Sequence, residues 1–212
     1  NLVGIKSETE AEGSSYSDIA RIRSITNKLG IKLFVKIGGV EALNDIYNCI
    51  ELSVDGIIAP MVETKFGAKK FVDIIDKLKL NKNPHLSINI ETQNGVNNFK
   101  EIIKIISKKI NNITIGRSDL SSSYFDKGVF PNSDFILKKI KYVSQLASKH
   151  HLTTTVGGSI NAETIKLYSK EKNLDKYLTK IETRKVMLPT NSFLKKKYAL
   201  ENALKFEEIY IL

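Results

Sequence analysis

Two acidic residues, Glu91 and Asp119, follow short apolar segments in a pattern that suits divalent-cation chemistry. Glu91 ends the run 86–91, and Asp119 comes shortly after the run 112–116. One helical pattern, 96–109, separates the two runs, which is the order of a strand, a crossover helix and a parallel strand. Neighbouring strands lie about 5 Å apart. We therefore expect the two carboxylates to form an oxygen-only site for Mg²⁺ or Mn²⁺.

Such a site would suit the chemistry of 2-oxo acids. A metal with open positions can chelate the carboxylate and keto oxygens of a 2-oxo acid and stabilise its enolate. Lys36 and Arg117 would then hold a carboxylate or polarise the keto oxygen. A histidine-rich zinc site is not expected, because all three histidines lie at the opposite ends of the predicted elements: His85, His150 and His151.

Charged residues, glycines and small polar residues follow nearly every predicted strand, at the end where active sites of parallel sheets collect. Glycine pairs there would let backbone N–H groups approach an anionic group. This concentration of polar residues indicates an enzyme. The predicted catalytic residues are Lys36, Glu8, Glu10 and Arg117, and the predicted substrate-binding residues are Lys6, Gly116, Ser118, Gly157, Gly158 and Arg184.

Several of these residues also have a purely structural interpretation, which the sequence leaves open. Glu91 and Asp119 would then be helix N-caps or partners of ion pairs without metal. Lys36 would only form an ion pair with Glu8 or Glu91. Two further pairs would be structural, the first on the last strand and the second at a helix N-terminus: Glu182 with Arg184, and Glu10 with Glu12.

The elements that must position these residues alternate strictly between strands and helices. The expected strands are 2–8, 32–37, 56–61, 86–91, 112–116, 152–156 and 177–188. The expected helices are 14–30, 40–52, 66–80, 96–109, 134–150, 162–170 and 192–212. The irregular segment 121–132 is a candidate active-site loop.

This alternation predicts an α/β fold with a parallel sheet whose strands are covered on both faces. The length of 212 residues favours a (β/α)8 TIM barrel over an open sheet. A barrel of this kind needs eight strands. We therefore expect the first strand to lie upstream of Asn1, outside this chain.

The composition is that of a globular chain without a membrane-spanning segment. No apolar run approaches the length that would cross a bilayer. The single cysteine, Cys49, lies in an apolar helical pattern and is expected to be a buried thiol. A chain without disulfides favours a cytoplasmic location. With no internal linker, residues 1–212 are expected to form one domain, with 191–212 as a C-terminal helix used in oligomer contacts.

The formal net charge of +10 raises the question of a nucleic-acid or membrane partner. The lysines are spread over every predicted helix, and no stripe combines basic with aromatic residues. We therefore expect solvated helix faces, with a general attraction for anionic substrates, and neither nucleic acid nor membrane as a partner.

At these motifs the chain resembles the HpcH/HpaI aldolase/citrate lyase family, a group of phosphoenolpyruvate/pyruvate-binding TIM barrels. The resemblance covers about residues 3–186. The segments that carry it are Ile90-Glu91-Thr92 with Gly95-Val96-Asn97, Ile115-Gly116-Arg117-Ser118-Asp119-Leu120-Ser121, and Gly56-Ile57-Ile58-Ala59-Pro60-Met61-Val62-Glu63-Thr64.

The resemblance implies a divalent metal held by Glu91 and Asp119. It implies reversible aldol cleavage of a 2-oxo acid that releases pyruvate or a relative, or a related lyase or acyl-CoA condensation. It also implies a trimer or hexamer in which the C-terminal helix is exchanged between neighbours. The apolar character of that helix, with Leu200 and Leu204, agrees with a partner.

Two positions depart from the family pattern. Lys36 stands where the aldolases carry an arginine, and no histidine follows the acidic residue of the first strand. The histidine serves proton transfer, so Glu8 or Glu10 would have to supply the base. The alternatives are a Schiff-base aldolase that uses Lys36 or Lys6, a non-catalytic metabolite-binding barrel or degenerate subunit, and a nucleic-acid-binding protein.

Overall fold

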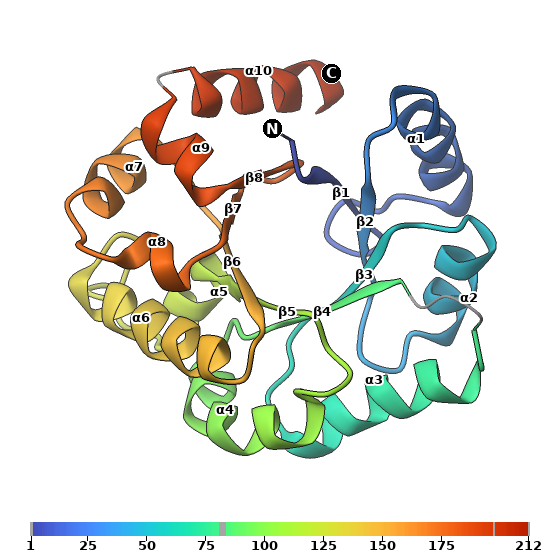
Figure 1. The fold of residues 1–212 in the computed structure, drawn as a ribbon, viewed down its shortest axis with the longest axis horizontal. Helices are drawn as coiled ribbons and strands as arrows, with labels where there is room; N and C mark the ends of the chain where they lie inside the picture. Colours follow the sequence, from blue (N-terminus) through green and yellow to red (C-terminus); the bar gives the residue numbers. More distant parts are fainter. Residues whose placement is uncertain (1, 81–83, 197, 212) are drawn as a thin grey trace.

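The computed structural model describes residues 2–80, 84–196 and 198–211, and these form a closed barrel surrounded by helices (Figure 1). The strands are β1 (Gly4–Glu8), β2 (Leu33–Lys36), β3 (Gly56–Ala59), β4 (His85–Asn89), β5 (Asn112–Gly116), β6 (Thr153–Gly157), β7 (Lys180–Glu182) and β8 (Val186–Pro189). The helices are α1 (Tyr16–Leu29), α2 (Leu43–Glu51), α3 (Lys65–Lys77), α4 (Gln93–Ile106), α5 (Arg117–Ser122), α6 (Asp134–Lys149), α7 (Ala162–Ser169), α8 (Leu174–Tyr177), α9 (Thr190–Lys195) and α10 (Ala199–Ile211).

The predicted TIM barrel is confirmed, but its closure differs from the prediction. β1 to β7 run parallel, whereas β8 lies between β7 and β1 and pairs antiparallel with both. We predicted one strand over 177–188 and an eighth strand upstream of Asn1. That prediction is wrong, because the chain reverses at 183–185 and a β7–β8 hairpin completes the ring. The sheet is therefore not wholly parallel.

The strands are apolar because successive residues face two buried environments. Ile57 belongs to the main core between strands and helices, whereas the next residue, Ile58, belongs to a second cluster inside the barrel. Phe34 and Met187 join Ile58 in that inner cluster. This inner cluster fills one part of the barrel interior.

Hydrogen-bonded polar side chains continue from this cluster across the neighbouring strands, since Ile58 is in register with Ser87 and Ser87 with Asn112. Asn112 Nδ2 donates to Ser87 Oγ at 2.9 Å, and Thr153 Oγ1 donates to Asn112 Oδ1 at 2.8 Å. Ser87 Oγ and Thr114 Oγ1 lie 3.2 Å apart. Buried polar groups are tolerated when they are paired in this way. The interior of the barrel is therefore partly apolar and partly a paired polar network.

The helices begin and end at local signals that the sequence carries. α1 starts with a capping box between Ser15 and Asp18, and it ends at Gly30, whose φ of 63° is the left-handed conformation that glycine adopts easily. Thr92 caps α4 by accepting a hydrogen bond from the N–H of Gly95 at 3.0 Å. Since Thr92 follows Glu91 directly, this cap also fixes the backbone of a predicted metal ligand.

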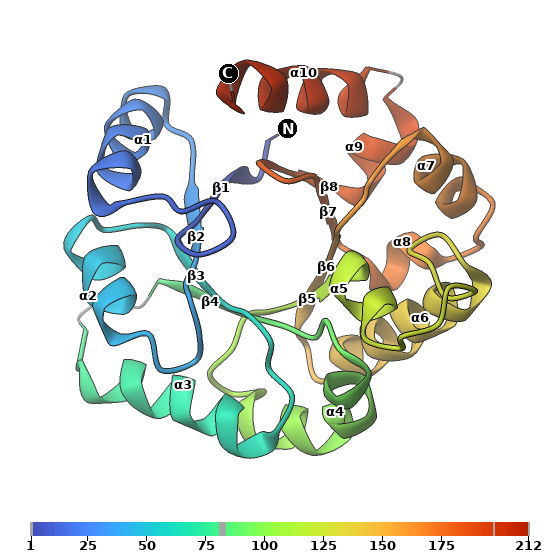
Figure 2. The same cartoon turned by 180° about the vertical axis from the view of Figure 1, so that it is seen from behind.

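Three features of the helical layer were not predicted. α5 occupies the start of the segment that we expected to be an irregular loop, and α8 was not expected at all. The expected single helix over 192–212 is divided into α9 and α10 within the described residues. Figure 1 places α10 outside the barrel, beside β1 and β8. Figure 2 shows the opposite side, where the β1–α1 loop crosses in front of the strands.

Two predictions about individual features are confirmed. Cys49 is a free thiol that is only 1% exposed, and burial raises its pKa to about 12. In the described part of the chain, no helix has the length and apolar character needed to cross a membrane.

Candidate active site

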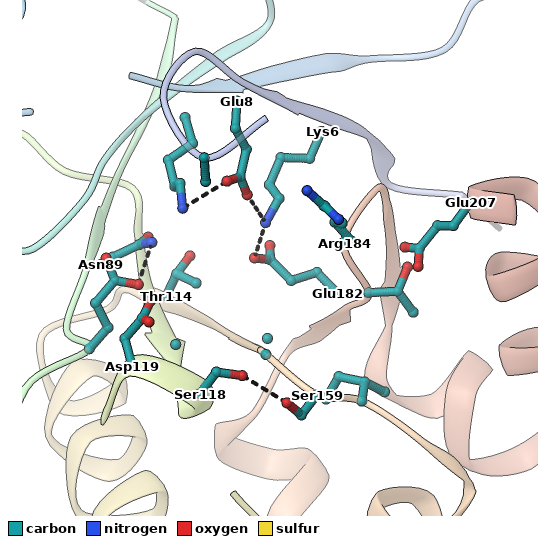
Figure 3. Close-up of a pocket in the computed structure, with 18 of the residues that line it drawn as sticks. Lys6, Glu8, Asn89, Thr114, Ser118, Asp119, Ser159, Glu182, Arg184 and Glu207 are labelled. Carbon is teal, nitrogen blue, oxygen red and sulfur yellow. Dashed lines mark hydrogen bonds and ion pairs between the residues drawn. The ribbon is translucent and has the colours of Figure 1, made fainter. Parts of the chain in front are cut away.

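A cavity of about 470 Å³ lies at the carboxyl ends of the barrel strands. Its wall contains all of the predicted site residues except Glu10 and Arg117. Figure 3 shows charged side chains entering it from opposite sides, with Asp119 on one side and Lys6 and Glu182 on the other. The rim thus gathers residues from positions 6 to 207 of the chain in one place.

The two predicted metal ligands both line this cavity. Glu91 is only 3% exposed, and its two carboxylate oxygens accept hydrogen bonds from Met61 N–H at 2.9 Å and Asn89 Nδ2 at 3.0 Å. Burial raises the pKa of Glu91, and the nearby charge of Asp119 acts in the same direction. Asp119, in the first turn of α5, is exposed to the cavity. A cation between the two would relieve their repulsion.

The residues present suit a hard divalent cation. Each carboxylate oxygen has a second lone pair, so the hydrogen bonds to Glu91 leave room for a metal. The side-chain amide oxygen of Asn89, Oδ1, is buried and has no hydrogen-bond partner among the described residues. The described residues contain no group of three or more acidic, histidine or cysteine side chains that could hold a metal without further ligands. Mg²⁺ commonly uses one or two carboxylates and completes its shell with water and substrate.

A chain of four charges crosses the side of the cavity that lies opposite Asp119. Lys6 Nζ lies 3.0 Å from Glu8 Oε1 and 3.0 Å from Glu182 Oε1. Lys36 Nζ lies 2.9 Å from Glu8 Oε2. Lys36 therefore has the ion-pair partner that the structural interpretation suggested, and it also lines the cavity.

These contacts fix the charge states of Lys6 and Glu8. Burial lowers the pKa of Lys6, but the carboxylates of Glu182 and Glu8 outweigh burial and raise it above its ordinary value. Burial raises the pKa of Glu8, but Lys6 and Lys36 outweigh burial and lower it. Lys6 is therefore a charged ammonium and Glu8 a charged carboxylate at neutral pH. Neither is well suited to the nucleophile or base role that the sequence left open.

Arg117 lies in a different place from the one predicted. Its side chain is 0% exposed, and it is not among the residues that line the cavity. Nε and Nη2 donate to the carbonyl of Gly158 at 3.0 and 2.6 Å, and Nη1 donates to Asn132 Oδ1 at 2.8 Å. Nη2 also donates to the carbonyl of Ser159 at 2.8 Å. The structure does not bring Arg117 into the cavity wall with the other predicted residues, because its donors hold the loop after β6.

Glu10 is also outside the cavity. It is exposed on the β1–α1 loop and lies against the backbone of Gly38, where an added Cβ would be 2.6 Å from Glu10 Oε1. The prediction that Glu10 supplies a base is not supported by this placement. The neighbouring Glu12 is instead buried: it accepts hydrogen bonds from Glu8 N–H at 3.2 Å and Arg184 Nε at 3.1 Å, and it pairs with Lys185.

The glycine pair after β6 makes a close approach to the start of α5. Gly158 has a φ of 82°, and an added Cβ would lie 2.7 Å from the backbone nitrogen of Ser118. Ser118 Oγ and Ser159 Oγ are 2.8 Å apart, and Figure 3 shows this pair on the wall opposite Lys6. Two hydroxyls and nearby backbone amides can hold an anionic group here.

Several lining residues were not predicted as part of the site: Asn89, Thr114, Ser159, Glu182, Leu204 and Glu207. The period of two along a strand would have found some of them. Asn89 and Thr114 lie two residues before Glu91 and Gly116, on the same inward face. Glu207 had no such signal. It belongs to α10 and reaches the rim because its Oε1 accepts a hydrogen bond from Lys185 N–H at 2.7 Å.

Comparisons with known proteins identify relatives of this arrangement. A model of the HpcH/HpaI aldolase/citrate lyase family matches residues 19–156, which include Glu91 and Asp119. Comparison with curated proteins gives no significant sequence match.

Solved structures with the same fold are longer and distant in sequence. An HpcH/HpaI aldolase from Desulfitobacterium hafniense DCB-2 has a TM-score of 0.66 and 12% identity, covering 97% of this chain and 82% of that one. The citrate synthase SbnG has a TM-score of 0.69 and 14% identity, with coverages of 97% and 84%. A citrate lyase from Burkholderia xenovorans LB400 has a TM-score of 0.68 and 11% identity, with coverages of 98% and 75%. At these identities the likeness establishes the fold.

Proposed function

The chain belongs to the HpcH/HpaI aldolase/citrate lyase family, and from this premise we propose that it is a divalent-metal-dependent carbon–carbon lyase acting on a small 2-oxo acid. The observation that carries the proposal is the meeting of Glu91 and Asp119 in one polar cavity. Buried acidic groups of this kind mark functional sites when a cleft and a specific charge partner accompany them.

Glu91 and Asp119 would hold Mg²⁺ or Mn²⁺. Bound there, the cation would supply electrostatic stabilisation of the negative charge that develops on the keto oxygen. The hydrogen bonds from Met61 N–H and Asn89 Nδ2 fix the Glu91 carboxylate in place, so the ligand is oriented before the cation arrives.

The chain's own residues would bind and orient the substrate. The carboxylate of the 2-oxo acid would lie against Ser118 and Ser159, whose hydroxyls are 2.8 Å apart. The ammonium of Lys36, held by Glu8 at 2.9 Å, would add positive charge on the opposite side. This anchoring at both ends would keep the bond to be broken in one orientation.

Cleavage of a 4-hydroxy-2-oxo acid would proceed in two proton-coupled steps. A carboxylate of the cavity takes the proton of the 4-hydroxyl group, the bond between C3 and C4 breaks, and C4 leaves as an aldehyde carbonyl. The electron pair of the broken bond forms the enolate of pyruvate. The same proton is then delivered to C3, which gives pyruvate. Run in reverse, these steps are an aldol addition.

The charge state of Lys6 argues against the Schiff-base alternative. A nucleophilic lysine needs a neutral amine, whereas Glu182 and Glu8 outweigh the effect of burial and raise the pKa of Lys6. Lys36 also lies in an ion pair. Trapping with pyruvate and borohydride is therefore expected to label neither residue. The proposed partners remain a small-molecule 2-oxo acid and further copies of the chain, in a cytoplasmic setting.

Calorimetric titration tests the proposal directly. Metal-stripped protein is titrated with Mg²⁺ and Mn²⁺, with and without oxalate, which resembles the pyruvate enolate. We expect metal binding that tightens with oxalate and is lost in Asp119→Ala. Asp73→Ala, which removes an exposed carboxylate of α3, is the matched control and should bind like the wild type. Wild-type protein that binds neither metal would overturn the proposal.

A further inference from the structure

Two acidic residues of the cavity, Glu182 and Glu207, are left without a role in the scheme above. We propose that Glu182 is the group that carries the proton during carbon–carbon bond cleavage, with Lys6 positioning its carboxylate. This inference rests on the proposed lyase function, because it names the residue that performs one of its steps.

The other carboxylates of the cavity are held by neighbouring groups or, in the case of Asp119, assigned to the cation. The acidic residues that line it are Glu8, Glu91, Asp119, Glu182 and Glu207. Glu8 has a lysine on each oxygen, and both oxygens of Glu91 accept hydrogen bonds. Glu207 accepts a hydrogen bond from the backbone of Lys185, and Figure 3 places it at the edge of the cavity beyond Arg184.

Glu182 combines one held oxygen with one unengaged oxygen. Its Oε1 lies 3.0 Å from Lys6 Nζ. Its Oε2 is buried and has no hydrogen-bond partner in the described part of the chain. An unpartnered oxygen on a buried carboxylate is costly in a purely structural role. Rotation about the last side-chain bond exchanges the two oxygens of the carboxylate, so an oxygen without a partner can be turned toward the cavity to accept and return a proton.

The surroundings leave space for Glu182 and direct it into the cavity. An added Cβ on Gly157 would lie 2.8 Å from Glu182 Cγ and 2.9 Å from Oε1, so residue 157 must be small for this side chain to fit. Figure 3 shows the carboxylate between Lys6 and the wall that carries Ser118 and Ser159. That wall is where the substrate carboxylate is proposed to bind, which places Glu182 across from it.

The role is consistent with the order of proton transfers. In cleavage, the Glu182 carboxylate takes the proton of the 4-hydroxyl group as the C3–C4 bond breaks, and returns it to C3 of the enolate. In the reverse direction it takes a proton from C3 of pyruvate and gives it to the new alkoxide. The proton is conserved, no electron acceptor is needed, and Lys6 keeps its charge throughout.

The exchange of methyl protons of pyruvate for deuterium, followed by NMR in D₂O with Mg²⁺-loaded protein, isolates this step. We expect Glu182→Gln to slow the exchange by about 10²–10⁴-fold, the usual contribution of a positioned acid or base. The Kd for oxalate, measured by calorimetry on the same variant, should change by less than about threefold, because the amide keeps the contact of Oε1 with Lys6.

Glu182→Asp is the second variant, and it covers the case in which the glutamine variant unfolds. It keeps a carboxylate for Lys6 but withdraws it by one methylene, so we expect exchange at least about tenfold slower than in the wild type. A residue that only balanced the charge of Lys6 would leave this variant near the wild-type rate. Glu101→Gln, on the exposed face of α4, is the control for the loss of one carboxylate.

The outcomes separate the two claims. If the wild-type protein exchanges deuterium and both Glu182 variants exchange it at nearly the same rate, the role of Glu182 is overturned and the lyase function stands. Wild-type protein that exchanges no deuterium, and that releases no pyruvate from 4-hydroxy-2-oxopentanoate, would overturn both. Slow exchange in the variants with unchanged oxalate binding would support the assignment.

Discussion

Gly116 lies so close to Glu91 that no side chain fits at position 116. An added Cβ would be 2.4 Å from Glu91 Oε2 and 2.9 Å from Glu91 Cβ. Gly116 ends β5 and Glu91 follows β4, so the contact joins the two strands that carry the proposed metal ligands. The glycine predicted to bind substrate therefore has a second task, which is to leave space for a ligand carboxylate.

Gly116→Ala is expected to weaken metal binding without unfolding the protein. The new methyl group must displace the Glu91 carboxylate, and removal of a supporting contact typically costs about 10–100-fold in metal affinity. Calorimetry with Mn²⁺ measures the change. Gly39→Ala is a suitable control, because nothing lies within 4 Å of its added Cβ. Equal affinities in the two variants would show that the Glu91 position does not matter for binding.

Glu91→Gln is expected to stabilise the metal-free protein at neutral pH. Burial raises the pKa of Glu91, so its ionised form is disfavoured in the folded state. A raised carboxyl pKa gives stability at low pH that is lost as the pH rises through the folded-state value. The variant does not titrate there, so its advantage should grow from about pH 4 to about pH 7.

Thermal melting in the presence of a chelator tests this sign. A gain of about 1 kcal/mol corresponds to a Tm increase of about 2–4 °C for a chain of this size. The variant remains compatible with its surroundings, because the unpartnered Asn89 Oδ1 can accept from the new amide after a flip of the Asn89 side chain. The Tm of the variant minus the Tm of the wild type should be larger at neutral pH than at acid pH. A difference that is smaller at neutral pH would show that the ionised form of Glu91 does not destabilise the fold.

The sequence located most of the site because parallel strands deliver their carboxyl ends to one rim. That rule placed Lys6, Glu8, Lys36, Glu91 and Asp119 together, and the cavity contains all of them. It could not give side-chain direction after a strand ends. The first residue past β5, Arg117, begins the α5 helix and does not line the cavity.

The closure of the barrel escaped prediction for a different reason. Residues 177–188 form one continuous β-like pattern, and the turn at 183–185 contains no glycine or proline to mark it. Only pairing with β1 on one side and β7 on the other defines β8. Contacts between residues far apart in the sequence cannot be predicted from the pattern of a short segment. The same limitation hid Glu207, whose helix reaches the rim through tertiary contacts.

Lys6→Met is expected to destabilise the fold by about 3–5 kcal/mol, since removing one partner leaves buried charge uncompensated. Glu8 and Glu182 would then lack the ammonium that lies 3.0 Å from each of them. Lys6 is one of the two lysines that lower the pKa of Glu8, so without it the pKa of Glu8 should rise in the folded state, and the variant should lose stability relative to the wild type as the pH rises. Denaturant melts at about pH 5 and about pH 8 measure this.

The matched control for Lys6→Met is Lys69→Met, which removes an exposed ion pair on α3. Exposed pairs contribute about 0–1 kcal/mol, so this variant should behave like the wild type at both pH values. A Lys6→Met deficit that is equal at the two pH values would show that the pKa of Glu8 does not depend on Lys6.

Arg117→Ala is expected to cost about 3 kcal/mol or more. The guanidinium is fully buried and satisfies the carbonyls of Gly158 and Ser159, which would be left without donors. The loop after β6 should then lose its fixed position. Arg117→Lys retains the charge but not the planar set of donors, so it should recover only part of the stability. Full recovery by lysine would show that charge alone is needed.

The last prediction concerns assembly, which the family resemblance and the exposed apolar side chains of α10 both favour. Ile209 is 68% exposed on that helix, and an apolar side chain of this kind is commonly covered by a partner. We expect sedimentation at three or six times the chain mass of 23.8 kDa, and a shift toward the monomer in Ile209→Lys.

Ile105→Lys, on the exposed side of α4, controls for the added charge. A wild-type protein that remains monomeric at about 100 μM, well above the Kd of most stable oligomers, would contradict the prediction. It would then leave α10 as a purely intramolecular wall of the cavity.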